Sequence, residues 1–118
     1  MYEYKAKLLR IVDGDTVDVL IDVGFSTFKK ERVRLYGINT PECRTRNLEE
    51  KKKGLAAKDR LEEILASFGE NFLIKTQIDK KGKYGRILGE IFSLDKSSNA
   101  NQMLLSEGHA VEYFGGKK

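Results

Sequence analysis

A single stretch of helical periodicity interrupts a chain that is otherwise rich in strand-like segments, and its position limits the folds that the chain can adopt. Between residues 57 and 68 the apolar side chains recur with the spacing of an amphipathic helix, and Gly69 follows as a stop signal. The apolar stripe consists of Ala57, Leu61, Ile64, Leu65 and Phe68. Because such a helix must bury its apolar face, we expect it to pack against a sheet built from the flanking strands.

The start of this helix has two interpretations. Asn47 and Glu50 have the spacing of a capping pair, which would place the start at that point. Gly54 equally suits a helix entrance, and residues 43–53 would then form a charged, mobile loop. The sequence leaves both interpretations open.

Strand-like segments lie on both sides of the helix. The pair Asp13-Gly14 is typical of a tight turn, so the first two segments are predicted to form a hairpin, which a third segment extends into a meander. A second hairpin with a basic tip follows the helix, and then a short helix over residues 101–107 and an extended segment over residues 109–114. The strand-like segments are residues 4–12, 17–23 and 28–38 before the helix and residues 71–78 and 86–94 after it.

This order predicts an all-β or α+β fold. The commonest plan that fits is a closed five-stranded barrel of the oligonucleotide/oligosaccharide-binding (OB) type, with the amphipathic helix inserted before the fourth strand and a short second helix after the fifth. A β-sandwich or an open α+β sheet would give the same pattern.

Length and composition restrict the function further. The chain of 118 residues fits one domain, residues 1–118, and it has one cysteine, Cys43, and one histidine, His109. An intramolecular disulfide and Cys/His zinc sites are therefore excluded, and any metal must have oxygen ligands. We expect Cys43 to be a passive thiol, since its only possible imidazole partner is far away in sequence, and His109 to be a packing or surface residue.

The sequence shows no leader-like apolar core at its start and no run of apolar residues long enough to cross a membrane. We therefore expect a soluble, monomeric, cytoplasmic protein without a membrane partner, secreted only if a leader has been removed. The net charge of +4 and the pI near 9.1 favour a polyanionic partner such as nucleic acid.

The run Asp13-Gly14-Asp15-Thr16 has a structural and a functional interpretation. As a tight turn it needs no further explanation. Functionally, Asp15 would present a carboxylate to a hard cation, with other oxygen ligands from the Asn39 amide and the Thr40 carbonyl.

Arg34 and Glu42 lie on either side of Pro41, the only proline in the chain. Pro41 cannot donate to a sheet ladder, so the third strand is expected to end there with Glu42 at its rim. Arg34 and Arg86 could be ordinary solvated strand residues, or a pair whose guanidinium groups bind phosphate oxygens and stabilise the charge at phosphorus. Glu42 could pair with a nearby surface arginine, or orient and deprotonate an attacking water.

Lys83 and Tyr84 lie in the basic tip of the second hairpin. Such a tip is unremarkable by itself. Its functional interpretation is that Lys83 contacts a backbone phosphate while Tyr84 packs on a sugar or a base.

Four runs of residues together resemble the staphylococcal (thermonuclease-like) nuclease family in order and spacing, over roughly residues 4–112. Each run is weak alone, but four in register make coincidence improbable. The runs are Asp13-Gly14-Asp15-Thr16, Arg34-Leu35-Tyr36-Gly37-Ile38-Asn39-Thr40-Pro41-Glu42, Lys83-Tyr84-Gly85-Arg86 and Asn101-Gln102-Met103-Leu104-Leu105-Ser106-Glu107-Gly108.

The resemblance implies a five-stranded barrel, dependence on calcium, and hydrolysis of the 5′ P–O bond of DNA or RNA to leave 3′-phosphates. By position, Asp15 matches the metal carboxylate of the family and Thr40 its metal-bound carbonyl. Arg34 and Arg86 match the phosphate-stabilising arginines, and Glu42 matches the proposed general base.

Two departures from the family pattern bear on these expectations. Asn39 stands where the family often has a second metal-binding aspartate, so a ligand oxygen is kept and a unit of charge is lost. The third, C-terminal helix of the staphylococcal enzyme has no counterpart in this sequence. Lys83 and Tyr84 match nucleotide-contacting positions, and Tyr113 matches a further one approximately. The leading hypothesis is thus a calcium-dependent endonuclease, and the alternatives are a nucleic-acid-binding barrel that has lost catalysis and a protein-interaction module.

Overall fold

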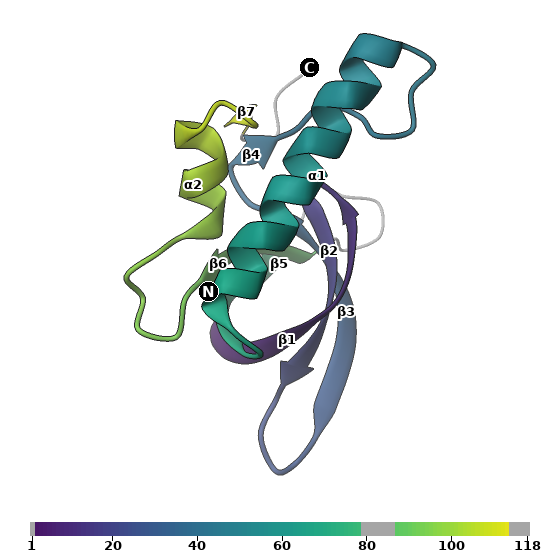
Figure 1. Cartoon of the computed structure of the whole chain (residues 1–118). Helices are drawn as coiled ribbons and strands as arrows, with labels where there is room; N and C mark the ends of the chain where they lie inside the picture. Colours follow the sequence, from purple (N-terminus) through teal and green to yellow (C-terminus); the bar gives the residue numbers. More distant parts are fainter. Residues whose placement is uncertain (1, 79–86, 114–118) are drawn as a thin grey trace.

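The computed structural model describes residues 2–78 and 87–113, and it contains the expected succession of three strands, a long helix, two strands and a short helix (Figure 1). Two very short strands, β4 and β7, are added to this plan. The elements are β1 (Tyr2–Asp13), β2 (Thr16–Asp22), β3 (Phe28–Leu35), β4 (Ile38–Asn39), α1 (Leu48–Phe68), β5 (Phe72–Ile78), β6 (Ile87–Phe92), α2 (Ala100–Ser106) and β7 (Val111–Glu112).

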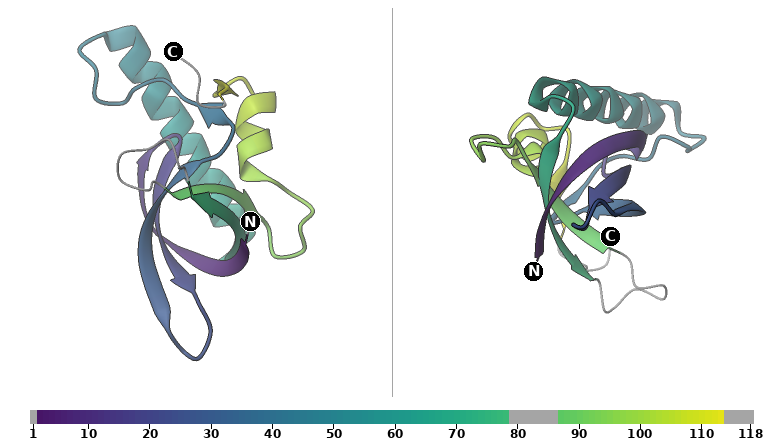
Figure 2. Two further views of the ribbon diagram at one scale, coloured as in Figure 1. Left: turned by 180° about the vertical axis from the view of Figure 1, so that it is seen from behind. Right: turned by 90° about the horizontal axis from the view of Figure 1, so that it is seen from below.

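Five of the strands form a closed barrel in the order β1-β2-β3-β6-β5. The barrel closes because β1 pairs antiparallel with β2 on one edge and with β5 on the other. Strands β3 and β6 pair in parallel. The predicted OB-type barrel is therefore confirmed, and the sandwich and the open sheet are excluded. Strands β4 and β7 form a separate small sheet near the start of α1 (Figures 1 and 2).

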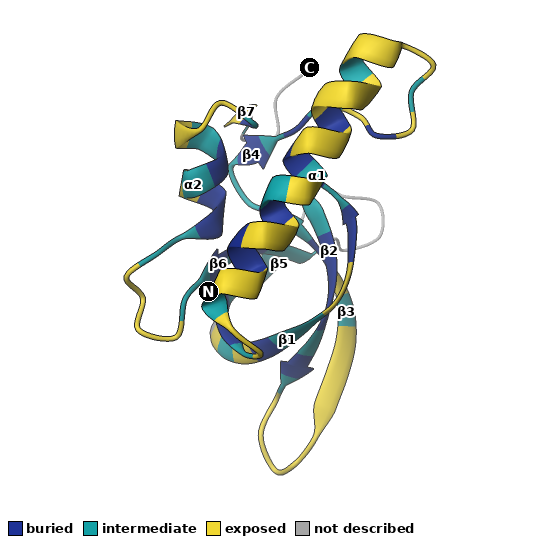
Figure 3. Ribbon diagram, in the orientation of Figure 1, coloured by how far each residue is buried: buried dark blue, intermediate teal, exposed yellow. Residues whose placement is uncertain are grey.

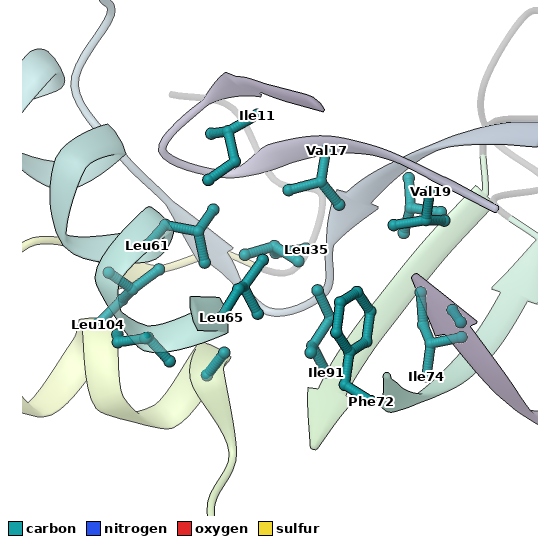
Figure 4. Packing of buried hydrophobic residues seen from close by; sticks show 14 of the residues in the cluster. Ile11, Val17, Val19, Leu35, Leu61, Leu65, Phe72, Ile74, Ile91 and Leu104 are labelled. Atoms are coloured by element: carbon teal, nitrogen blue, oxygen red, sulfur yellow. The ribbon is translucent and has the colours of Figure 1, made fainter. Parts of the chain in front are cut away.

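Helix α1 covers the barrel with the apolar stripe that its sequence predicts. Its buried face is turned toward the strands and its other face is exposed (Figure 3). Leu61 and Leu65 of α1 lie beside Leu35 of β3, in one apolar cluster that also includes Phe72 and Ile91 (Figure 4). No helix among residues 2–78 and 87–113 is long and apolar enough to span a bilayer.

The start of α1 settles the choice between Asn47 and Gly54. The Asn47 side chain accepts hydrogen bonds from the backbone N–H groups of Glu49 and Glu50 at 3.1 and 3.2 Å, so the helix begins at Leu48. Glu50 does not complete a capping pair, since its carboxylate accepts from the backbone N–H of Glu42 at 3.4 Å. The interpretation that the helix begins at Gly54 was therefore wrong.

Gly54 has a different role, because a β-carbon there would lie 2.5 Å from the Glu42 carbonyl oxygen and 2.7 Å from that of Pro41. Glycine in a helix interior costs about 1 kcal/mol relative to alanine. Here it lets the backbone of residues 41–42 cross directly over α1.

The third strand ends earlier than its sequence pattern indicates. The expected segment, residues 28–38, breaks after Leu35 because Gly37 adopts a φ of 80°, which turns the chain. Ile38 and Asn39 then pair with Glu112 and Val111 instead of continuing the barrel. As a result, the chain that follows Arg34 folds back toward the β1–β2 turn.

Candidate functional site

Asp15 lies in the tight turn between β1 and β2 and is buried. One carboxylate oxygen, Oδ2, accepts the backbone N–H of Thr40 at 3.1 Å, and the other, Oδ1, accepts the Thr16 hydroxyl at 3.1 Å. The carbonyl oxygen of Asp15 also accepts the backbone N–H of Leu35 at 2.7 Å. The turn is thus attached both to the end of β3 and to the segment after β4.

Gly14 lets this turn pack closely against its neighbours. A β-carbon at Gly14 would lie 2.8 Å from the β-carbon of Ala57 on α1 and 2.9 Å from the hydroxyl oxygen of Thr40. The glycine of the Asp-Gly pair is therefore required by a three-way contact as well as by the turn. Its sequence neighbourhood alone predicted only the turn.

Arg34, near the end of β3, is the centre of the cluster, and its side chain is 14% exposed. Its Nη1 lies 3.3 Å from Asp15 Oδ2, and its Nη2 donates to the Asn39 side-chain oxygen at 3.3 Å and to the Ile38 carbonyl at 3.2 Å. The guanidinium carbon also lies 5.1 Å from the ring centre of Tyr113, within cation–π range. These contacts fix the planar fork in one orientation.

The predicted metal ligands come together around this guanidinium. The Asp15 carboxylate and the Asn39 amide oxygen both contact Arg34, and Thr40 is joined to Asp15 through its backbone N–H. Two further buried oxygens of the described residues, Thr40 Oγ1 and Asp13 Oδ1, have no hydrogen-bond partner.

The donor set fits a hard cation. Asp15, Asn39 and Thr40 would supply a carboxylate, an amide and a carbonyl oxygen, the ligand types that calcium takes. No group of three or more Asp, Glu, His or Cys side chains suited to a metal occurs among the described residues. The ligands of a calcium site at this position would therefore carry few formal negative charges.

Glu42 follows Thr40 on the segment that packs on Gly54, and its side chain is exposed. Its backbone is held to α1 by the hydrogen bond to Glu50. The described contacts of the cluster run through Asp15, Asn39, Thr40 and Tyr113, so a role for Glu42 stays a prediction.

The other predicted substrate contacts divide into two groups. Tyr113 is in place beside Arg34, and its backbone N–H donates to the Gly37 carbonyl at 2.9 Å. Lys83, Tyr84 and Arg86 lie outside the described residues. Their assigned roles stay predictions.

Cys43 is buried, and desolvation, together with the nearby Asp13 carboxylate, raises the pKa of its thiol. A raised pKa keeps the sulfur protonated at neutral pH. This agrees with the passive thiol expected from the sequence.

Asn101 begins the fourth of the runs that resemble the family, but the sequence patterns assigned this residue no role. It lies at the start of α2, is 1% exposed, and donates from Nδ2 to the carbonyls of Tyr36 and Gly89 at 2.9 and 3.1 Å. Its Oδ1 accepts the backbone N–H of Ile91 at 3.3 Å. It thus connects α2 and β6 to the turn that follows Arg34.

Replacing Asn101 by alanine is expected to lower the free energy of unfolding by about 2–4 kcal/mol, because buried backbone groups of Tyr36 and Ile91 would lose their partners. Urea unfolding followed by circular dichroism measures this. The neighbouring exposed Gln102→Ala variant is the control, and an equal, small effect in both variants would contradict the role of Asn101.

An open hollow of about 450 Å³ borders the cluster between β4, the start of α1 and the turn after α2. Its lining includes Asn39 and Thr40, Glu49 and Lys53 of α1, and His109 after α2. Two of the three predicted metal ligands, Asn39 and Thr40, thus line a concave part of the surface, and Asp15 is not among the lining residues. His109 lines this hollow instead of packing in the core.

Comparison with known proteins places this chain in a family. The family model described as staphylococcal nuclease homologue matches residues 32–118. Endonuclease YhcR of Bacillus subtilis (strain 168) is 29% identical over 95% of this chain and 9% of its own length. Protein ParB of Escherichia coli is 31% identical over 94% of this chain and 58% of its own, and a micrococcal nuclease of Shigella flexneri is 29% identical over 94% and 59%.

The chain therefore spans less than two thirds of the length of these curated relatives. Residues 32–118, which the family model matches, include Arg34, Asn39, Thr40 and Tyr113 of the cluster. Asp15 lies before the matched residues and contacts Arg34 from the β1–β2 hairpin. With more than half of its residues matched, this chain belongs to the staphylococcal nuclease homologue family.

Proposed function

We propose that this protein is a calcium-dependent endonuclease that hydrolyses the 5′ P–O bond of phosphodiesters in DNA or RNA and leaves 3′-phosphates. The observation that carries the proposal is the Arg34 guanidinium, which joins the Asp15 carboxylate to the Asn39 amide oxygen. Membership of the family and relatives named as nucleases support it.

Arg34 would bind the scissile phosphate and stabilise the charge that builds on its oxygens. Because Asp15, the Ile38 carbonyl and the Tyr113 ring already fix its orientation, little reorganisation is needed during the reaction. Arg86 would supply the second guanidinium of the pair. Arginine has a pKa above 12, so neither side chain is suited to protonate the leaving oxygen.

Glu42 would orient the attacking water and accept its proton as the water oxygen bonds to phosphorus. The 5′ P–O bond then breaks, and the leaving 5′-oxygen takes a proton from solvent. Calcium, held by Asp15, Asn39 and the Thr40 carbonyl, would supply Lewis-acid polarisation of a phosphoryl oxygen.

A second candidate function rests on Asn39. Its amide carries no charge, so in this second candidate calcium affinity would be too low for catalysis while binding of nucleic acid persists. Lys83 and Tyr84 would then contact the bound strand without any cleavage.

Incubating the purified protein with plasmid DNA and with RNA across a calcium titration tests the proposal. We expect cleavage that depends on calcium, stops with EDTA, and yields 3′-phosphate ends. Binding without cleavage at saturating calcium would favour the nucleic-acid-binding barrel, and the absence of salt-dependent binding would favour a protein-interaction module. Full cleavage by an Arg86→Ala variant would contradict the role assigned to the arginine pair.

A further inference from the structure

The β2–β3 hairpin extends beyond the rest of the barrel, at the end away from the β4–β7 sheet (Figures 1 and 2). Two aromatic side chains lie at its tip. Phe25 is 103% exposed, as in an isolated residue, and Phe28 is 52% exposed. Neither side chain contributes to the apolar core of the barrel.

The backbone at this tip does not favour a phenylalanine. The Thr27 N–H donates to the Gly24 carbonyl at 2.9 Å, and the two residues between them, Phe25 and Ser26, have φ values of 55° and 58°. A turn with two central residues of positive φ is of type I′, which prefers asparagine and glycine. A bulky side chain is disfavoured there, so neither packing nor turn geometry explains Phe25.

A row of basic side chains connects this tip to Arg34. Val33 and Leu35 point into the barrel, so the alternation of β3 turns Arg34, Arg32, Lys30 and Phe28 to its outer face. We call these four residues the β3 row. The row lies on β3 alone, and β2 runs beside it, with Thr16 opposite Arg34, Asp18 opposite Arg32 and Asp22 opposite Phe28.

Two of the three basic groups of the β3 row, Arg32 and Lys30, are accessible, whereas the Arg34 side chain is 14% exposed. Arg32 donates from Nε and Nη2 to both oxygens of Asp18 at 2.8 and 3.2 Å, yet its side chain is 61% exposed. The hydrogen bond from Arg32 lowers the pKa of Asp18, so the pair stays charged at neutral pH. Lys30 is exposed and has no ion-pair partner within the part of the chain that the structure describes.

We propose that the β3 row and Phe25 bind a single-stranded stretch of nucleic acid, which runs from a phosphate at Arg34 to a base stacked on Phe25. This inference rests on the proposed function for the position of that phosphate. Arg34 and Phe28 are separated by about 20 Å along the strand at 3.3 Å per residue, a length that holds several nucleotides. Roughly 4–16 nucleotides per OB fold is the usual range, with basic grooves and aromatic stacking as the means of binding.

Phe25→Asn and Lys30→Ala test the inference, with Lys29→Ala as the matched control. Lys29 has the same charge on the same strand but lies on the opposite face, where its Nζ is 3.0 Å from Glu31. Affinities for fluorescent oligothymidylate and oligouridylate of twelve and of three nucleotides are measured in EDTA by anisotropy. Without calcium, binding is separated from cleavage.

Phe25→Asn is expected to weaken binding of the twelve-nucleotide strands roughly 5- to 100-fold and to leave the three-nucleotide strands unaffected. The same variant should have a higher melting temperature, because asparagine tolerates the positive φ at this turn. Lys30→Ala should reduce the slope of log affinity against log salt by about 0.7, the value for one phosphate contact on a single strand. Lys29→Ala should change neither quantity.

Twelve-nucleotide affinities of Phe25→Asn and Lys30→Ala within twofold of the wild type would overturn the inference, and calcium-dependent cleavage would still test the proposed function separately. If the wild type binds vesicles of phosphatidylserine and phosphatidylcholine, and Phe25→Asn loses only that binding, the tip is a membrane contact and the inference is again overturned. A wild type that binds neither strand length in EDTA would also overturn the inference, and calcium-dependent cleavage would again test the proposed function separately.

Discussion

Replacement of Arg34 by lysine is expected to lower kcat for phosphodiester cleavage by about 10²–10³-fold. Lysine keeps the positive charge but loses the planar fork, and it cannot hold Asp15, Asn39 and the Ile38 carbonyl at once. The fall should appear mainly in kcat, because the fork acts on charge that develops in the transition state. Initial rates on a fluorogenic oligonucleotide at saturating calcium measure it.

Arg60→Lys is the matched control for this experiment. Arg60 connects α1 to α2 through a bidentate contact with Glu107 at 2.6 and 3.0 Å, and it lies outside the cluster around Arg34. Its replacement should leave kcat unchanged. Circular dichroism at the assay temperature verifies that both variants are folded, and a kcat within twofold of the wild type in folded Arg34→Lys would refute the phosphate-binding role.

Asn39→Asp is expected to raise calcium affinity about 30-fold. A full charge about 4 Å from a divalent ion contributes roughly 2 kcal/mol even at the dielectric constant of water. Asn39 already directs its side-chain oxygen to Arg34 at 3.3 Å, so the new carboxylate has a counter-charge in place when calcium is absent. Isothermal titration with calcium, together with the calcium concentration that gives half-maximal cleavage, measures the change.

The control is Asn71→Asp, an identical chemical change at the residue before β5 and outside the cluster. Calcium affinity in that variant should equal that of the wild type. If Asn39→Asp also leaves it unchanged, Asn39 is not a calcium ligand. The proposed function would then have to rely on another set of oxygen atoms.

The succession of strands and helices followed from local sequence patterns, because these patterns report which face of each element is buried. The stripe over residues 57–68 predicted α1, and the Asp13-Gly14 pair predicted the first hairpin. Asn47 was correctly selected as one of two possible helix starts. Each of these signals lies within a few residues of the feature that it predicts.

Features that depend on contacts between distant residues had no such signal. The break of β3 at Gly37 is stabilised by Glu112, which pairs with Ile38, and by Asn101, and both residues are far from Gly37 in sequence. Gly54 is explained only by the backbone of residues 41–42 that crosses it. Sequence periodicity describes one element at a time, so it could not find them.

The residues of the cluster around Arg34 were selected through the family resemblance, which carries information about three-dimensional arrangement, and their roles stay predictions. Asp15, Arg34, Asn39 and Thr40 come together as expected, and Tyr113 lies against the guanidinium. The contact between Tyr113 and Arg34 joins the two ends of the family match, and residue spacing alone could not have shown it.

Closure of the barrel through β1 and β5 also determines when the protein can fold during synthesis. Residues 2–6 of the first strand pair with residues 72–76, so the ribosome must complete α1 and β5 before the first strand is covered on both edges. Until then β1 has an open edge, and open edges of this kind promote pairing between chains. A pause in translation before β5 is available therefore prolongs the time during which this edge of β1 is open.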